Sequence, residues 1–172
     1  SATKAAADML ITAWGRTHKI PYMILRPTNN YGIGQYVEKL IPKTVKLANL
    51  GRKVPLHNHG QPYRNWLHAD DTAEAVFTII DKGDVGEIYN IAGGFEQSNF
   101  DTVRSVFDSM GIDISDGGKE NKHIDYSYSR PGQDVRYSLD DSKLRSLGWS
   151  PKKLFSKEIM SIVGYYKHKF IW

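Results

Sequence analysis

A run of polar residues, Arg26–Gly32, directly follows the short apolar segment Tyr22–Leu25. The run contains a threonine, two asparagines and a tyrosine, whose side chains donate and accept hydrogen bonds. In open α/β sheets, ligands bind beyond the carboxyl ends of the parallel strands, so a strand over residues 22–25 would place these groups at a ligand site. A turn rich in Asn and Gly that binds nothing explains the same residues equally well.

Two arginines lie in loop-forming segments further along the chain. Arg64 stands among aromatic residues in the segment 60–66, and Arg130 is followed by a Pro-Gly pair. The planar guanidinium group binds phosphate oxygens through paired hydrogen bonds, and Lys39 would complete a set of three cations suited to a diphosphate. Taken segment by segment, a solvated surface arginine is an equally good explanation.

Three histidines, His57, His59 and His68, suggest a metal site, because His-x-His on a strand places both rings on one face. Such a site would need a further ligand, for which Asp70 or Asp71 is available. Histidines in polar loops are usually solvated, so we predict no metal site. The chain also has no Gly-x-Ser-x-Gly turn, so nothing indicates a serine hydrolase.

The composition of the 172-residue chain, 40% apolar and 24% charged, is that of a folded globular protein. No apolar run approaches the roughly 20 residues of a membrane span, so we predict no membrane association. The absence of cysteine and of a signal peptide favours the cytoplasm. The net charge of +4 arises entirely in the last 22 residues, with five lysines and one glutamate, and therefore does not indicate nucleic-acid binding.

Apolar residues alternate between helical and strand spacing along the chain, which predicts an α/β fold. The predicted helices cover residues 3–18, a stretch from Asp70 or Asp71 to Gly83, a stretch from Ser98 to Gly111, residues 140–148, and a last one that begins at Ser156. The predicted strands cover residues 22–25 and 85–91, and the polar segment 113–122 predicts a surface loop.

Four predicted helices carry apolar stripes that we expect to face the core. The stripes consist of Ala6, Met9, Leu10, Ala13 and Trp14; of Val76, Phe77 and Ile80; of Val103, Val106, Phe107 and Met110; and of Ile159, Val163 and Tyr166. A buried parallel strand needs a neighbour on each side, and residues 22–25 have no earlier strand to pair with. We therefore expect the chain to be the later part of a larger α/β enzyme.

Six segments resemble, in this order, the extended short-chain dehydrogenases, and among them the dTDP-glucose 4,6-dehydratases. They are Ser1–Ala6, Leu25–Gly32, Glu38–Pro42, Arg64–Asp71, Gly86–Ile91 and Arg130–Gly132, which together extend over almost the whole chain. The resemblance implies the C-terminal part of an extended Rossmann-type enzyme. Residues 1–172 would then form a single incomplete unit, in which the last parallel strands of the dinucleotide-binding domain are interleaved with a mixed α/β nucleotide-sugar-binding domain.

The implied activity of the whole enzyme is that of an NAD-dependent lyase of carbohydrate biosynthesis. It would oxidise carbon 4 of the sugar, remove water across carbons 5 and 6, and return the hydride to carbon 6. In the family a catalytic tyrosine stands four residues before the lysine that matches Lys4, which is one position ahead of Ser1. The resemblance therefore implies that the 172 residues by themselves are inactive, because they lack this tyrosine and the glycine-rich NAD-binding turn.

Site residues follow from the same resemblance, position by position. Lys4 is given a catalytic and cofactor-binding role, since it would bond the nicotinamide ribose and favour the ionised tyrosine as a nearby cation. Thr28 and Asn29 would lie between the nicotinamide of NAD and the sugar phosphate. The positions that would hold the nucleotide-diphosphate sugar are Asn29, Lys39, Leu40, His57, Arg64, Asn90, Arg130 and Gln133.

Three departures from the dehydratase pattern leave the nucleotide base and the sugar open. His57 stands where the family has tyrosine, Asn65 where it has aspartate, and Gln133 where it has histidine. A related nucleotide-sugar epimerase or decarboxylase is the alternative enzyme, and a non-catalytic nucleotide-sugar-binding module is the alternative outside enzymology. The expected assembly is a homodimer.

Overall fold

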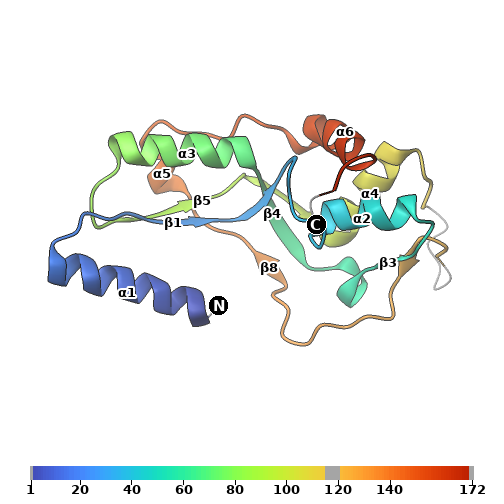
Figure 1. Ribbon diagram of the computed structural model, residues 1–172, viewed down its shortest axis with the longest axis horizontal. Helices are drawn as coiled ribbons and strands as arrows, with labels where there is room; N and C mark the ends of the chain where they lie inside the picture. The colour runs from blue at the N-terminus through green and yellow to red at the C-terminus, as the bar shows by residue number, and fades with distance from the viewer. Residues whose placement is uncertain (1, 115–120, 171–172) are drawn as a thin grey trace.

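The computed structural model describes residues 2–114 and 121–170 and shows an elongated α/β arrangement (Figure 1). The helices are α1 (Ala2–His18), α2 (Leu40–Asn49), α3 (Ala69–Lys82), α4 (Asn99–Met110), α5 (Ser142–Ser146), α6 (Phe155–Tyr166) and the short 3-10 turn η1 (His57–Gly60). The strands are β1 (Ile24–Pro27), β2 (Asn29–Tyr31), β3 (Val54–Pro55), β4 (Tyr63–His68), β5 (Ile88–Ile91), β6 (Phe95–Ser98), β7 (Ile124–Asp125) and β8 (Arg136–Tyr137). The predicted α/β class is confirmed.

The strands form a parallel β1–β5 pair, a larger sheet around β4, and a short parallel β3–β7 pair. In the larger sheet β4 pairs with β2 and β8 in parallel and with β6 antiparallel. The chain passes from the first sheet to the second at two places, from β1 to β2 through Thr28 and from β5 to β6 through residues 92–94. The two sheets are thus joined by two strand connections that run side by side.

A buried amide lies where these two connections meet. The side-chain oxygen of Asn65, on β4, accepts hydrogen bonds from the Thr28 hydroxyl at 3.1 Å and from the backbone N–H of Gly93 at 2.8 Å. A side chain at Gly93 would collide with the carbonyl oxygen of Trp66, so the close approach of this connection to β4 requires glycine. Asn65 is only 3% exposed and therefore joins three chain segments inside the protein.

Three apolar clusters fill the interior, at different places along the molecule. One lies between β2, β4 and the helices α2, α4 and α6, a second between α3, β5 and α5, and a third between the β3–β7 pair and α4. The hydroxyl of the fully buried Tyr166, in the first cluster, donates to the carbonyl oxygen of Gly32 at 2.9 Å and accepts from the N–H of Gln35 at 2.6 Å. These bonds attach α6 to the loop after β2.

Local sequence signals locate α4 and α6 well. Ser98 is the N-cap of α4 and accepts from the N–H of Asp101, and Gly111 ends the helix in the left-handed conformation, as predicted. The predicted inward residues of α6 are buried, but the helix begins at Phe155 after the N-cap Leu154, not at Ser156. Of the predicted loop 113–122, residues 115–120 lie outside the described residues.

Two predicted apolar stripes are wrong about the core. Met9 of α1 is 69% exposed and Phe77 of α3 is 73% exposed. The α1 residues least exposed to solvent are Asp8, Thr12 and Gly15, and Gly15 leaves room for the ring of Tyr22. The periodicity identifies an apolar face correctly, but it does not say that something covers that face.

Other boundaries and caps also differ from the prediction. β1 begins at Ile24 and β5 at Ile88, although the N–H of Gly86 still donates to the carbonyl oxygen of Tyr22 at 2.7 Å before them. The N-cap of α3 is His68, whose ring accepts from the N–H of Asp70, so neither Asp70 nor Asp71 caps this helix. Helix α2 and strands β2, β3, β4, β6, β7 and β8 were not predicted.

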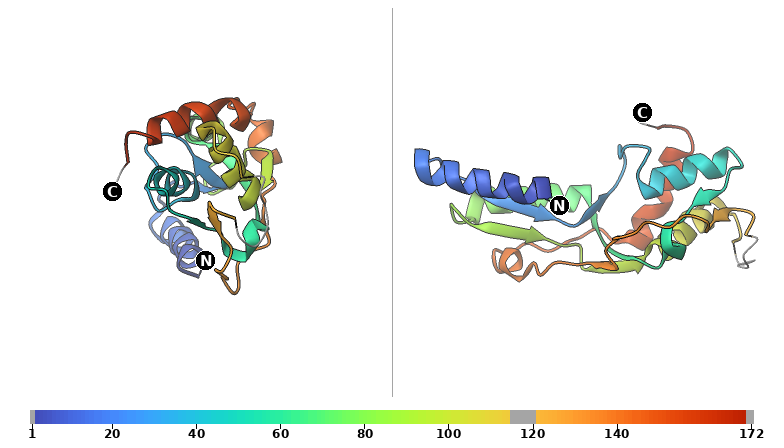
Figure 2. Two further views of the ribbon diagram at one scale, coloured as in Figure 1. Left: turned by 90° about the vertical axis from the view of Figure 1, so that its right-hand side faces the viewer. Right: turned by 90° about the horizontal axis from the view of Figure 1, so that it is seen from below.

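α1 and α3 lie on opposite sides of the β1–β5 pair, whereas α2, α4 and α6 gather at the other end of the molecule (Figures 1 and 2). Within the described residues, β5 is the only strand paired with β1, so the other edge of β1 carries no strand. Among those residues, too, no helix combines the length and the apolar character that crossing a bilayer demands.

The Asn65 amide provides a first prediction. Asn65→Ala leaves the Thr28 hydroxyl and the Gly93 N–H without their partner, so we expect the free energy of unfolding to fall by about 1–3 kcal/mol. Asn49→Ala is the matched control, because this exposed amide donates only to the carbonyl oxygen of Lys167. Urea denaturation followed by tryptophan fluorescence measures both, and an equal loss for the two variants would contradict the prediction.

Candidate functional site

The turn η1 brings four of the predicted site residues to one place. Asn58 and His59 adopt left-handed backbone conformations with φ of 50° and 55°, followed by Gly60 with φ of 73°, and the chain reverses here between β3 and β4. The turn packs against the loop 129–134, which carries Arg130 and Gln133. His57 belongs to η1 itself, and Arg64 follows on β4.

The Asn58 side chain joins the turn to the loop. Its amide nitrogen donates to the carbonyl oxygen of Arg130 at 3.2 Å and to the side-chain oxygen of Gln133 at 3.0 Å. Its oxygen accepts from the N–H of Arg130 at 3.1 Å and from the hydroxyl of Ser129 at 3.2 Å. Asn58 was not predicted, although an asparagine in a His-Asn-His-Gly run signals a left-handed turn.

Arg64 lies against the same loop. Its guanidinium group donates to the carbonyl oxygens of Tyr63 at 2.6 Å and Asp134 at 3.0 Å. Burial lowers the pKa of Arg64 from its usual value, Asp134 opposes this shift, and Arg130 adds to it as a nearby cation. Among the described residues neither arginine forms an ion pair with a carboxylate. Although the Asp134 carboxylate acts on Arg64, the two neighbouring cations form no ion pair, and such a pair is suited to an anion.

His57 lies at the edge of this site. Its ring is half-buried and meets the ring of Tyr128 edge-on, with 5.7 Å between the centroids. Its buried Nδ1 atom has no hydrogen-bond partner among the described residues. A ring nitrogen in this state can bond a polar group of a ligand.

The remaining predicted residues lie on other elements. Lys4 is exposed on α1, Asn90 on β5 donates to the carbonyl oxygen of Asp140 at 2.9 Å, and Asn29 is half-buried at the start of β2. Lys39 precedes α2 and its ammonium group contacts Glu38 at 2.8 Å, while Leu40 packs against the core. Within the described residues, no hydrogen bond or ion pair joins these five to the group around η1.

The two residues with hydroxyl groups in the polar run Arg26–Gly32 are buried. Thr28 is buried and donates to Asn65, as described above. Tyr31 is buried too, and its ring meets those of Trp66 and His68 edge-on. Burial raises the pKa of Tyr31 far above its usual value, so the phenol stays neutral. The Tyr31 side chain fills the first apolar cluster, and its buried hydroxyl has no hydrogen-bond partner among the described residues.

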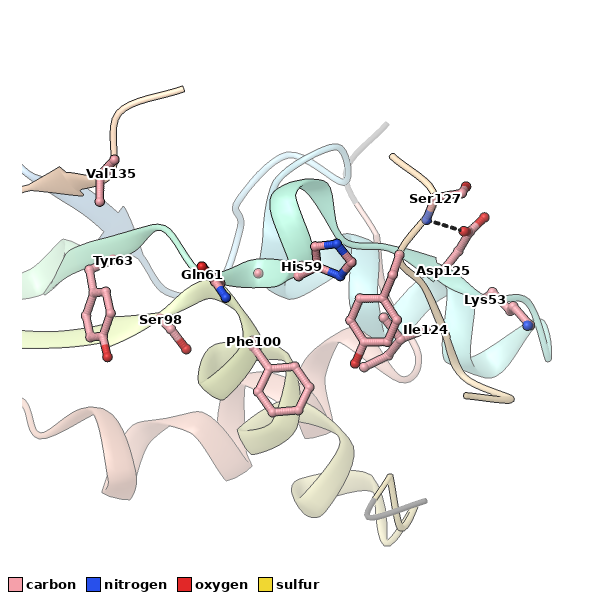
Figure 3. Close-up of a pocket in the computed structure, with 12 residues that line it drawn as sticks. Lys53, His59, Gln61, Tyr63, Ser98, Phe100, Ile124, Asp125, Ser127 and Val135 are labelled. Atoms are coloured by element: carbon pink, nitrogen blue, oxygen red, sulfur yellow. Dashed lines mark hydrogen bonds between the residues drawn. The ribbon is translucent and has the colours of Figure 1, made fainter. Parts of the chain in front are cut away.

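A cavity of about 990 Å³ lies beside η1, between the start of α4 and the segment 124–127 (Figure 3). Phe100 and Tyr63 line one part of it and Lys53 another. The ring of His59 stacks on Tyr126 at 5.6 Å at its border. None of the predicted site residues lines this cavity, although Tyr63 and Val135, which do, are the sequence neighbours of Arg64 and Asp134.

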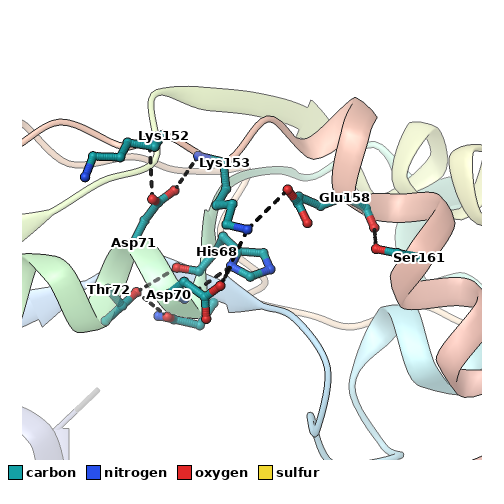
Figure 4. Close-up of polar contacts among 9 residues, drawn as sticks. His68, Asp70, Asp71, Thr72, Lys152, Lys153, Glu158 and Ser161 are labelled. Carbon is teal, nitrogen blue, oxygen red and sulfur yellow. Dashed lines mark hydrogen bonds and ion pairs between the residues drawn. The ribbon is translucent and has the colours of Figure 1, made fainter.

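Residues considered as metal ligands have structural roles instead (Figure 4). The Asp70 carboxylate lies 3.6 Å from both His68 Nδ1 and Lys153 Nζ. Asp71, only 2% exposed, accepts from the backbone N–H groups of Lys152 and Lys153 at 3.0 Å each and so holds the segment before α6 against α3. In the described part of the chain, no cluster of three or more His, Cys, Asp or Glu residues is placed to hold a metal ion.

Comparison with known proteins shows which family the chain is similar to. Residues 1–92 match the model of the NAD dependent epimerase/dehydratase family. The chain is 37% identical to the low-salt glycan biosynthesis protein Agl12 of Haloferax volcanii, over 96% of the chain and 51% of that protein. It is 36% identical to dTDP-glucose 4,6-dehydratase 1 of Escherichia coli, over 100% of the chain and 48% of that protein. The chain spans about half the length of these relatives.

Solved structures show the same fold. The dTDP-glucose 4,6-dehydratase DesIV of Streptomyces venezuelae, solved with NAD and TYD bound, superposes with a TM-score of 0.88 at 36% identity, over 96% of this chain and 50% of that one. The UDP-glucose 4-epimerase of Thermotoga maritima has a TM-score of 0.82 at 23% identity, over 95% of this chain and 52% of that one. The second likeness concerns the fold alone.

Adjacent aspartates at the start of α3 allow a matched test of the Asp71 contact. Asp71→Ala removes a buried acceptor of two backbone hydrogen bonds, and we expect the free energy of unfolding to fall by about 1.5–3 kcal/mol. Asp70→Ala removes an exposed carboxylate and should change it by less than about 1 kcal/mol. Thermal or urea denaturation measures both, and a smaller loss for the Asp71 variant than for the Asp70 variant would disprove this role.

Proposed function

The chain belongs to the NAD dependent epimerase/dehydratase family, and from that premise we propose that it binds a nucleoside-diphosphate sugar as the substrate-binding part of a dTDP-glucose 4,6-dehydratase. The observation that carries the proposal is the pair Arg64 and Arg130, two neighbouring cations that form no ion pair among the described residues, although the Asp134 carboxylate acts on Arg64. The named dehydratases at 36–39% identity support the dTDP-sugar as substrate.

In this proposal the diphosphate lies across the arginine pair. Arg64 is fixed through the backbone carbonyls of Tyr63 and Asp134, which leaves further N–H groups of its fork for phosphate oxygens. Arg130 approaches from the loop 129–134, with Gln133 and His57 beside it. Charge-assisted hydrogen bonds from two sides would replace water around the phosphates, as burying a double negative charge requires.

The proposed cofactor is NAD. Lys4 and Asn29 would bind its ribose and phosphate groups. Lys4 is exposed on α1 and has no ion pair among the described residues, and the half-buried Asn29 carries an amide whose chemistry suits a ribose or phosphate group. The Thr28 hydroxyl is already bonded to Asn65, so Thr28 would shape the turn rather than donate to a ligand. Bound NAD would supply the hydride acceptor and donor for oxidation at carbon 4 and reduction at carbon 6.

The two ends of the molecule suggest how these tasks are divided. We propose that α1, β1, β5 and α3 belong to a dinucleotide-binding domain and that the elements around α2, α4 and β3 belong to the nucleotide-sugar-binding domain (Figure 2). The two parts are interleaved in sequence, because the chain crosses between them at Thr28 and again after β5. A dehydratase is favoured over an epimerase, since the named epimerase structures are only 19–23% identical.

Removing either arginine tests the substrate site. Arg64→Ala and Arg130→Ala each remove a charged hydrogen-bond donor, so the binding free energy of dTDP should weaken by about 1.5–3 kcal/mol. Arg104→Ala is the control, because that arginine lies over the Phe100 ring on α4. Calorimetry on the protein at its full natural length measures all three variants. Unchanged dTDP affinity in both site variants would refute the proposal.

The exposed apolar face of α1 leads to a prediction about assembly. Met9, Leu10 and Trp14 are each at least 60% exposed there, and a second copy of the chain would remove them from water. We expect light scattering over a dilution series to show a concentration-dependent dimer. Trp14→Glu should shift it toward monomer, and Phe77→Glu, on the exposed face of α3, should not. A monomer at every concentration would contradict the prediction.

A further inference from the structure

Asn58 and His59 are non-glycine residues in a left-handed turn of three residues. Gly60, the third, is needed for space, since a Cβ atom there would lie 2.5 Å from Leu56 Cδ2 and 2.8 Å from Phe100 Cβ. A left-handed conformation costs free energy for any residue with a side chain, though least for asparagine. Such a conformation persists only where surrounding contacts determine it, and Asn58 has contacts of this kind.

The Asn58 amide uses its full hydrogen-bonding capacity on one loop. An asparagine side chain has two donor hydrogens and an oxygen with two lone pairs, and all four find partners between Ser129 and Gln133. In addition, the backbone N–H of Asn58 donates to the carbonyl oxygen of Tyr128 at 3.1 Å. Both the N–H and the carbonyl of Arg130 bond to this one side chain. The backbone of Arg130 is therefore held from both sides.

We propose that Asn58 is a positioning residue, which presets Arg130 and Gln133 for the phosphate groups of a nucleoside diphosphate. The inference rests on the proposed function, since it assigns a task within that same site. Arg130 is exposed, and an exposed loop arginine would have to be ordered when the ligand binds. Because Asn58 orders the backbone of this loop beforehand, less conformational entropy is lost on binding.

The chemistry of the amide explains why no other residue type serves equally well at this position. Glycine would adopt the backbone conformation without strain but would supply none of the four bonds. Aspartate would keep the acceptors but would place a carboxylate against the oxygens of Arg130 and Gln133, to which the Asn58 nitrogen now donates. Asparagine alone offers both donors and acceptors at this length with tolerance for a left-handed φ.

Asn58→Gly is the discriminating variant, because it removes the side chain and relieves the backbone at the same time. His59→Gly is the matched control, since it relieves the neighbouring left-handed residue, whose ring stacks on Tyr126 and, among the described residues, forms no hydrogen bond with the loop 129–133. In calorimetry with dTDP, we expect Asn58→Gly to weaken affinity by about 2- to 13-fold and His59→Gly to leave it unchanged. Equal effects of the two variants would overturn the proposal.

A mutant cycle separates positioning from general support of the fold. If Asn58 acts through Arg130 and Gln133, then Asn58→Gly should have no further effect on dTDP affinity in a chain that already carries Arg130→Ala and Gln133→Ala. Additive losses would mean that Asn58 acts independently of these two side chains, and the proposal would fail. Affinity for thymidine, which has no phosphate, should be the same in Asn58→Gly and in the unchanged protein.

Amide hydrogen exchange gives a readout that does not depend on the ligand. Asn58→Gly should speed exchange at the Arg130 amide, whose acceptor is lost, while the protein keeps its thermal midpoint. If dTDP binds and Arg130→Ala weakens it but Asn58→Gly does not, the proposed function stands and the positioning role is refuted. If the unchanged protein does not bind dTDP, the proposed function fails, and unchanged exchange at Arg130 would also refute the anchoring of the loop.

Discussion

A single buried amide, that of Asn65, lies where the chain passes twice from one sheet to the other. Its oxygen accepts from Thr28 in one connection and from Gly93 in the other, so both crossings are held against β4. A buried N–H or hydroxyl without a partner is costly, and this geometry satisfies both with one acceptor. Because β4 is held at Asn65, the two neighbouring residues on this strand are held as well. Arg64 contacts the loop 129–134, and Trp66 belongs to the first apolar cluster.

Charged side chains outside the candidate site have different partners from those within it. Outside the site, Asp71 is buried and bonds two backbone N–H groups, and Arg136 pairs with Glu96 at 2.8 Å. The Arg136 hydrogen bond is the main reason that the pKa of Glu96 lies below its usual value. In the site, the hydrogen bonds of Arg64 go to backbone carbonyls, and both the Asp134 carboxylate and a second cation, Arg130, act on it. A site arranged in this way retains positive charge for an anionic ligand.

The η1 turn connects the candidate site to the core. Gly60 is pressed against Leu56 and Phe100, which belong to or pack on the third apolar cluster, while Asn58 in the same turn bonds the loop of Arg130. Packing of apolar side chains thereby determines where the turn lies, and the turn determines where the arginine loop lies. In the proposed phosphate site, the loop that carries Arg130 is therefore positioned by a turn that packs on the protein interior.

Local signals in the sequence were sufficient for several features. Ser98, Asp101 and Gly111 delimit α4, since capping depends on residues within one turn of each other. The guanidinium chemistry of Arg64 and Arg130 made both candidates for binding phosphate, and their role in binding stays a prediction. Tertiary structure decided the rest. The apolar faces of α1 and α3 are exposed, because burial depends on what packs against a helix and not on its own periodicity. Asn58 could not be connected to Arg130 from the sequence, since 72 positions separate them and only the folded chain brings the amide within hydrogen-bond distance of the loop.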